Sequence, residues 1–198
     1  MQEIRNRKPS EEKPWLQYFT DEAKQAKLPK ESIYQHLVSV NDHHRQDVAI
    51  RYINSTMTYG ELLDGIEQAA AAFAAIGVKK GDIVTFCAIT TPELITMIYA
   101  LNKLGACAMV IDPRYTASVI LDFVNNAKSR VLVTLTVTAP VRELVEQSKM
   151  EHIITFSPAE RISGLMGVYA RMRTKIKLPQ DDRVMNWKQF MALGAGKT

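Results

Sequence analysis

Four polar residues that follow apolar runs of the sequence are the first candidates for chemistry. Thr90 and Thr91 come after one run, and Asp112 and Arg114 come after the next. Ligands in open α/β sheets bind beyond the carboxyl ends of the strands. If the two runs are parallel strands, these residues could line a substrate channel. Thr91 could equally cap a helix and Asp112 could be an ordinary loop residue, so purely structural roles stay open.

Two further motifs resemble ligand-binding patterns. The run Asp42–His44, followed by Asp47, contains metal-ligand side chains, but neighbouring histidines at a helix end point in different directions. The final residues Gly196–Thr198 resemble the end of a phosphate-binding loop. Such a loop lies between a strand and a helix, and its first glycine would fall at Met191. We therefore expect no catalytic residue, no cofactor-binding residue and no metal site in this chain.

The composition is that of an ordinary globular protein. The chain has 198 residues, of which 46% are hydrophobic and 23% are charged, and its formal net charge is +4. These values exclude collagen-like, disordered and disulfide-scaffold proteins. The two cysteines, Cys87 and Cys107, lie in apolar runs, which favours buried, reduced thiols. The sequence shows neither a signal peptide nor a membrane-spanning stretch, so we expect a cytoplasmic protein.

The run 161–177 is basic: it holds five cations and no acid, interleaved with apolar residues. An amphipathic basic helix can lie on an anionic membrane surface. The alternative that we favour is a helix whose charged face is solvated and whose apolar face packs on its own domain. Peripheral membrane contact is therefore possible but not favoured, and we expect no nucleic-acid partner.

The main architectural signal is a regular alternation of apolar runs and helical patterns. Short apolar runs, 22 to 24 residues apart, begin near Ile83, Ala106, Arg130 and His152. Continuous apolar runs are typical of parallel strands that are covered on both faces. Each gap between them has room for a helix and contains a helix-start signal. The pattern predicts an α/β fold with a mostly parallel, doubly wound sheet and helices on both faces.

Local signals also place several helix starts. Thr58, Tyr59 and Glu61 belong to a capping-box pattern, which predicts a helix that begins after Thr58. The run 157–160 has the same spacing and predicts a second capped helix. A last short helix is expected over 185–193.

A series of short blocks recurs in a specific order along the chain. The blocks are Met57–Leu62, Gly77–Asp82, Thr91–Glu93, Leu101–Arg114 and Asn186–Phe190. In type and order they resemble the AMP-forming adenylating enzymes, the superfamily of acyl-CoA synthetases, luciferases and nonribosomal-peptide adenylation domains. The resemblance covers about residues 14 to 193, with one departure at Val110, where many members carry a proline.

The resemblance implies a reaction for the parent enzyme. Such an enzyme uses ATP and Mg²⁺ to convert a carboxylic acid into an acyl-adenylate, and then transfers the acyl group to CoA. The resemblance also implies that the phosphate loop and the mobile C-terminal domain are absent here. We therefore expect an inactive N-terminal part of an acid–CoA ligase, and the Asp112–Arg114 form with the basic run is most similar to fatty-acid CoA ligases. The family motif residues with mainly structural roles are Thr58, Tyr59, Glu61 and Gly105.

The resemblance sets the domain boundaries and one expected partner. A polar tail is placed at 1–13 and a partial N-terminal α/β domain at 14–198. The predicted helix 92–104 is apolar nearly all round, and a helix of that kind needs burial on every side. Without the rest of the parent enzyme, we expect an apolar patch, an open strand edge and self-association of this chain. The alternative function is a non-catalytic α/β interaction module that needs a partner chain.

Overall fold

The computed structural model describes residues 8–27, 29–136, 140–173 and 178–196. The chain divides into two compact units, residues 1–31 and residues 32–198. The first unit contains α1 (Pro9–Glu12), η1 (Pro14–Tyr18) and α2 (Asp21–Gln25). None of the described residues in these three elements is buried. The predicted division of the chain after residue 13 stays a prediction.

The second unit begins with a helix and a β-hairpin. Helix α3 (Ile33–Asn41) starts at a capping box that Ser32 and Gln35 form, and it continues into η2 (Asp42–His44). Strands β1 (Val48–Tyr52) and β2 (Ser55–Thr58) then pair antiparallel. The hairpin leads directly into α4 (Tyr59–Ala75), which is the longest of the described helices.

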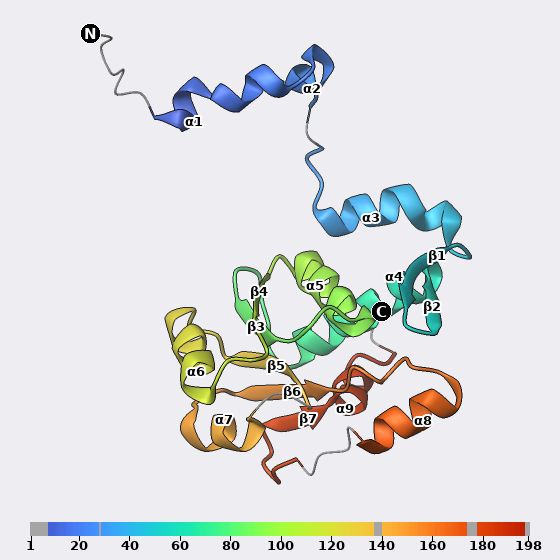
Figure 1. Cartoon of the computed structure of the whole chain (residues 1–198), viewed down its shortest axis with the longest axis vertical. Helices are drawn as coiled ribbons and strands as arrows, with labels where there is room; N and C mark the ends of the chain where they lie inside the picture. The colour runs from blue at the N-terminus through green and yellow to red at the C-terminus, as the bar shows by residue number, and fades with distance from the viewer. Residues whose placement is uncertain (1–7, 28, 137–139, 174–177, 197–198) are drawn as a thin grey trace. The chain divides into compact units, whose positions relative to one another are not determined.

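Five strands form the main sheet, and each strand is parallel to its neighbours (Figure 1). They are β3 (Ile83–Cys87), β4 (Cys107–Ile111), β5 (Val131–Leu135), β6 (His152–Phe156) and β7 (Val184–Asn186). Their order across the sheet is β4-β3-β5-β6-β7. The remaining helices are α5 (Pro92–Leu104), α6 (Ala117–Asn126), α7 (Val141–Gln147), α8 (Gly164–Arg173) and α9 (Trp187–Ala192). The α/β prediction with a mostly parallel sheet is confirmed.

Helices cover both faces of the sheet, as continuous apolar strands require. Successive residues of a strand point to opposite faces, and Phe86 and Cys87 accordingly belong to different clusters of buried side chains. The Phe86 cluster includes apolar residues of α4 and α5 together with Phe190 of α9. The Cys87 cluster includes those of α6 and α7. The sheet is therefore doubly wound.

Strands β3 and β5 are neighbours in the sheet, but the helices that follow them lie on opposite faces. Helix α5 follows β3 and packs in the Phe86 cluster, whereas α7 follows β5 and packs in the Cys87 cluster. This arrangement creates a topological switch point, which is where ligands bind in open α/β sheets. The carboxyl edge of the sheet is therefore the place to look for a site.

Two local predictions are wrong. The run 157–160 forms a turn rather than a helix start: the Glu160 amide donates to the Ser157 carbonyl over 3.2 Å. The next helix, α8, begins only at Gly164. The predicted helix 185–193 is shorter, because its first two residues belong to β7, which pairs with β6.

Two further expectations, about Cys107 and about helix α5, are partly wrong. Cys87 on β3 is buried, but Cys107 on β4 is exposed, because β4 has a neighbour on one side only. Helix α5 also finds more cover than predicted, since it packs against α4 and α3 as well as the sheet. An apolar patch centred on α5 is therefore absent from the described surface. None of the described helices is long and apolar enough to span a bilayer.

Candidate functional site

The two threonines predicted at the end of β3 have different environments. Thr91 is buried and caps α5, since its hydroxyl accepts a hydrogen bond of 3.2 Å from the Leu94 amide. Thr90 is exposed beside it. The capping role explains Thr91 without any ligand, so a contact between this residue and a substrate stays a prediction.

Asp112 and Arg114, beyond the end of β4, form a closed pair. The Arg114 guanidinium donates to both carboxylate oxygens of Asp112 over 2.6 to 3.1 Å, and the Arg114 amide donates over 2.8 Å. These hydrogen bonds lower the pKa of Asp112 to about 2. Each charge is therefore already compensated, and a role for the pair in a substrate channel stays a prediction.

The family motif residues support the backbone. Thr58 accepts from the Glu61 amide over 3.2 Å, and the Glu61 carboxylate accepts from the Thr58 amide over 2.8 Å, which completes the capping box of α4. The Tyr59 amide donates to the Asp47 carbonyl. Gly105 ends α5 with φ of 70°, a left-handed conformation that disfavours residues with a Cβ atom. Thr58, Tyr59 and Glu61 thus stabilise the start of α4, which precedes β3 in the chain, and Gly105 ends α5, which follows β3.

The structure describes a cleft of about 470 Å³ at the carboxyl edge of the sheet. Helix α4 forms one wall, and the other walls come from residues that follow β3, β6 and β7. Its polar lining residues are Glu61, Asp64, Gln68, Glu93, Thr96, Glu160, Arg161 and Lys188. Met57, Gly65, Trp187 and Met191 complete the lining. Segments that follow three strands of the sheet thus converge on this cleft.

Glu93 is the least expected residue of this cleft. It is only 3% exposed, and its Oε2 is buried and accepts no hydrogen bond from the described residues. Its Oε1 lies 3.9 Å from Arg161 Nε, an ion pair too long for a hydrogen bond. Burial raises the pKa of Glu93, although its own amide, the Thr91 hydroxyl and Arg161 act in the opposite direction.

In the sequence, Thr91–Glu93 is a helix start and one of the family blocks, and neither pattern gives Glu93 a role in a site. The one signal that could have singled out Glu93 is a carboxylate in the first turn of a helix with few polar residues. Nothing in the sequence shows that residues after β6 and β7 surround it, because that depends on strand order. The residues predicted from the sequence, Thr90, Thr91, Asp112 and Arg114, do not line this cleft, and their role in a substrate channel stays a prediction.

The charges of the cleft limit what it could bind. Four carboxylates face two cations along its lining, and Asp64 is paired with Arg45 over 2.6 Å. The excess of carboxylates favours cationic or hydrogen-bond-donating groups and disfavours carboxylate ligands. A ligand that donates a hydrogen bond to Glu93 Oε2 would also satisfy this buried acceptor, which is costly to leave without a partner.

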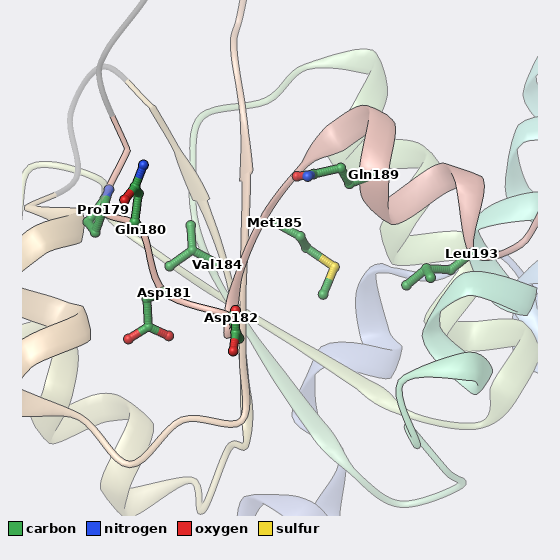
Figure 2. Close-up of a pocket in the computed structure, with 8 residues that line it drawn as sticks. All are labelled: Pro179, Gln180, Asp181, Asp182, Val184, Met185, Gln189 and Leu193. Carbon is green, nitrogen blue, oxygen red and sulfur yellow. The ribbon is translucent and has the colours of Figure 1, made fainter.

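A second cleft, of about 500 Å³, lies between β7, α9 and the segment 179–182 (Figure 2). Its carboxylates are Asp181 and Asp182. The Arg183 guanidinium pairs with Asp181 over 2.9 Å and also donates to the Val145 and Ser148 carbonyls near the end of α7. Arg183 thus holds this segment against α7 and Asp181 is engaged in pairing with it, which makes the second cleft a weaker candidate than the Glu93 cleft.

The structure describes the Asp42–Asp47 motif and only the first residue of the phosphate-loop-like tail 196–198. His44 pairs with Asp47 over 2.9 Å. Within the described residues, no group of three or more His, Cys, Asp or Glu side chains is suited to hold a metal ion. Lys197 and Thr198 of the loop-like tail lie outside the described residues.

Comparisons with known proteins point to one family. The model of the family described as "AMP-binding enzyme" matches residues 38–189. Acetyl-coenzyme A synthetase 1 of Candida albicans is 35% identical over 78 residues, which are 39% of this chain and 12% of that protein. The 3-hydroxypropionyl-coenzyme A synthetase of Metallosphaera sedula is 28% identical over 138 residues, 63% of this chain and 19% of that protein.

Solved structures agree in fold. Coronafacic acid ligase of Pectobacterium brasiliense superimposes with a TM-score of 0.66 at 19% identity, covering 82% of this chain and 29% of that one. At this identity the likeness concerns the fold alone. The chain spans less than a fifth of the length of these two curated relatives. Because the family match covers more than half of its residues, the chain belongs to the AMP-binding enzyme family.

Proposed function

We propose that this chain is the N-terminal α/β part of an ATP-dependent acid–CoA ligase. The observation that carries the proposal is the continuous family match over residues 38–189. The parallel sheet and the capped start of α4 support it, because they occur where the family blocks lie in the sequence. The parent enzyme would form an acyl-adenylate from a carboxylic acid and ATP, and then a thioester with CoA.

The residues present do not fit ATP and Mg²⁺ by themselves. The sequence has no glycine-rich loop between a strand and a helix to bind phosphates. The Glu93 cleft has a carboxylate-rich lining, which would repel both phosphates and a carboxylate substrate. We therefore assign no reaction step to this chain, and ATP, Mg²⁺ and CoA belong to the parent enzyme in our proposal.

A fatty acid is the substrate that we propose for the parent. Support comes from the Asp112–Arg114 pair and from the basic run 161–177, both of which resemble fatty-acid CoA ligases. The curated relatives named above are synthetases of acetyl- and 3-hydroxypropionyl-coenzyme A. Acetate, 3-hydroxypropionate and a long-chain acid are therefore the substrates to compare.

The first test is acid-dependent ATP–pyrophosphate exchange by the purified chain. We expect background exchange with acetate, 3-hydroxypropionate and palmitate, because stabilising the transferred phosphoryl charge needs donors and cations at the phosphates. We also expect ATP to bind no more tightly than about 1 mM. A clear acid-dependent signal would show that the chain is active alone.

The second test distinguishes a ligase part from an interaction module. Residues 38–189 replace the segment of the Candida albicans acetyl-coenzyme A synthetase that aligns with the same part of the family model, and the same enzyme with that segment deleted is the control. A ligase part restores exchange with acetate above the deletion control. A chimera that folds, as judged by a cooperative melting transition, but gives no exchange would favour a non-catalytic module.

A further inference from the structure

Helix α8 presents large apolar side chains to solvent. Leu165, Tyr169 and Met172 are 89%, 59% and 72% exposed, and their spacing of four and three residues places them on one face. Met166 and Val168 flank this face and are also exposed. A contiguous group of five large apolar residues is unusual on the surface of a monomer and marks an interaction site.

The rest of the protein packs against the side of α8 opposite these apolar residues. Gly167 is buried and Ala170 is half-buried, and a turn of 100° per residue places both on the side away from Leu165. A surface helix normally buries its large apolar residues and exposes its polar ones. Helix α8 does the reverse, so the expectation that its apolar face packs on its own domain is wrong.

Cations accompany this apolar face. The run 161–177 holds five Lys and Arg residues and no acid. Arg173 is exposed, and its guanidinium lies 5.5 Å from the centre of the Tyr169 ring. Tyr and Arg side chains combine an apolar body with a polar end, which suits the boundary between lipid headgroups and acyl chains. Helix α8 itself contains two of these cations, Arg171 and Arg173, so positive charge and large apolar side chains belong to the same helix.

We propose that α8 is an interfacial helix that binds the surface of a bilayer containing anionic lipids. Leu165, Tyr169 and Met172 enter the boundary between headgroups and acyl chains, and Arg173, which lies beside Tyr169, attracts anionic headgroups. The helix lies on the membrane without crossing it, since it has only ten residues. The chain is then a peripheral membrane protein that binds through this surface.

A second copy of the chain fits this face less well. A two-fold contact between two α8 helices would bring together two helices that each contain Arg171 and Arg173 and no acid, and like charges repel. An anionic bilayer offers both the negative charge and the apolar interior that the face lacks. The observed combination of groups therefore favours lipid as the occupant.

Vesicle flotation tests the proposal and separates lipid binding from aggregation, because aggregates do not float. The probes are vesicles of phosphatidylcholine alone and vesicles with 30% phosphatidylglycerol. We expect the chain to float with the anionic vesicles at low salt, to bind neutral vesicles at least ten-fold less, and to be released at about 0.5 M NaCl. Equal binding to both vesicles, or binding to neither, would overturn the proposal.

Matched variants assign the binding to α8. Leu165→Ser with Met172→Ser should reduce binding roughly ten-fold, whereas Ile33→Ser with Val40→Ser removes two exposed apolar residues of α3 and should leave it unchanged. Binding by the α8 variant at the wild-type level would refute the assignment.

A charge pair completes the design. Each Lys or Arg near an anionic surface contributes about a five-fold factor to binding. Arg171→Gln with Arg173→Gln, both in α8, should therefore lower binding about 30-fold. Arg142→Gln with Lys149→Gln removes the same charge from the region of α7 and should lower it by less than three-fold. Similar losses from both pairs would mean that net charge, not α8, attracts the lipid.

Discussion

The contact between Gly194 and α4 gives the sharpest test of the packing. A Cβ atom placed on Gly194 would lie 2.0 Å from the Gln68 carbonyl oxygen and 2.9 Å from the Ala72 amide nitrogen. Both are backbone atoms of α4, so neither can rotate away. Real Cβ atoms essentially never approach closer than 3.0 Å. Gly194→Ala therefore requires the segment after α9 to move about 1 Å away from α4.

The magnitude follows from what this movement disturbs. Gln68 Nε2 donates to the Met191 carbonyl over 2.9 Å, and Phe190 packs edge-on against Phe73 with ring centres 4.7 Å apart. Overpacking typically costs about 1–3 kcal/mol, and a lost hydrogen bond adds about 1 kcal/mol. We expect Gly194→Ala to lower the free energy of unfolding by about 3 kcal/mol. For a chain of this size, the melting temperature should fall by roughly 6–12 °C.

Gly65→Ala is the matched control. Gly65 lies inside α4, and its added Cβ would meet Thr96 Cγ2 at 3.4 Å, an ordinary contact. Alanine is more favourable than glycine in a helix interior by about 1 kcal/mol. The control should therefore raise the melting temperature, measured by circular dichroism, by about 2–4 °C. A Gly194→Ala protein that melts within 2 °C of the wild type would refute the packing of α9 on α4.

Three other outcomes are expected. Thr58→Ala should lower the free energy of unfolding by about 1 kcal/mol in urea titrations, because it removes the cap of α4; an unchanged midpoint would contradict the capping role. Burial raises the pKa of Glu93, so its ionisation should weaken the fold as pH rises through that pKa. Glu93→Gln should remove this loss of stability. If the melting temperatures of the wild type and the variant change in parallel from pH 4 to pH 7, this reasoning is wrong. The uncharged edge strand β4 and the exposed face of α6 should drive dimerisation at about 100 µM, measured by light scattering. Val110→Lys places a charge on this edge strand and should prevent dimerisation. A strictly monomeric wild type would exclude dimerisation through this edge.

The sequence predicts elements well where local and tertiary preferences agree. The strand predicted to begin near Arg130 is β5 (Val131–Leu135), whose residues are mostly apolar, favour strands and are all buried. Helix α5 also has its predicted bounds, with a threonine cap and proline at one end and a left-handed Gly105 at the other. In both cases every local signal favours the same structure.

Prediction fails where one local pattern is compatible with two structures. The Ser157–Glu160 run has capping-box spacing, yet its serine closes a turn: the Ser157 hydroxyl accepts from the Ala159 amide over 3.1 Å, and the next helix begins only at Gly164. Strand β7 has only three residues, and it exists because the edge of β6 offers it a partner. Such a strand has no periodicity of its own to detect.

The same limit explains why neither the Glu93 cleft nor the exposed face of α8 could be predicted. The sequence shows that a helix carries a carboxylate or an apolar stripe. Whether these side chains are buried or exposed depends on which other elements cover them. Glu93 is surrounded because the segments after β6 and β7 return to the α5 side of the sheet. Helix α8 is turned outward because its small residues, Gly167 and Ala170, allow the closer approach to the protein. Periodicity alone would bury the Leu165 face, so the orientation of α8 is information that only the tertiary structure supplies.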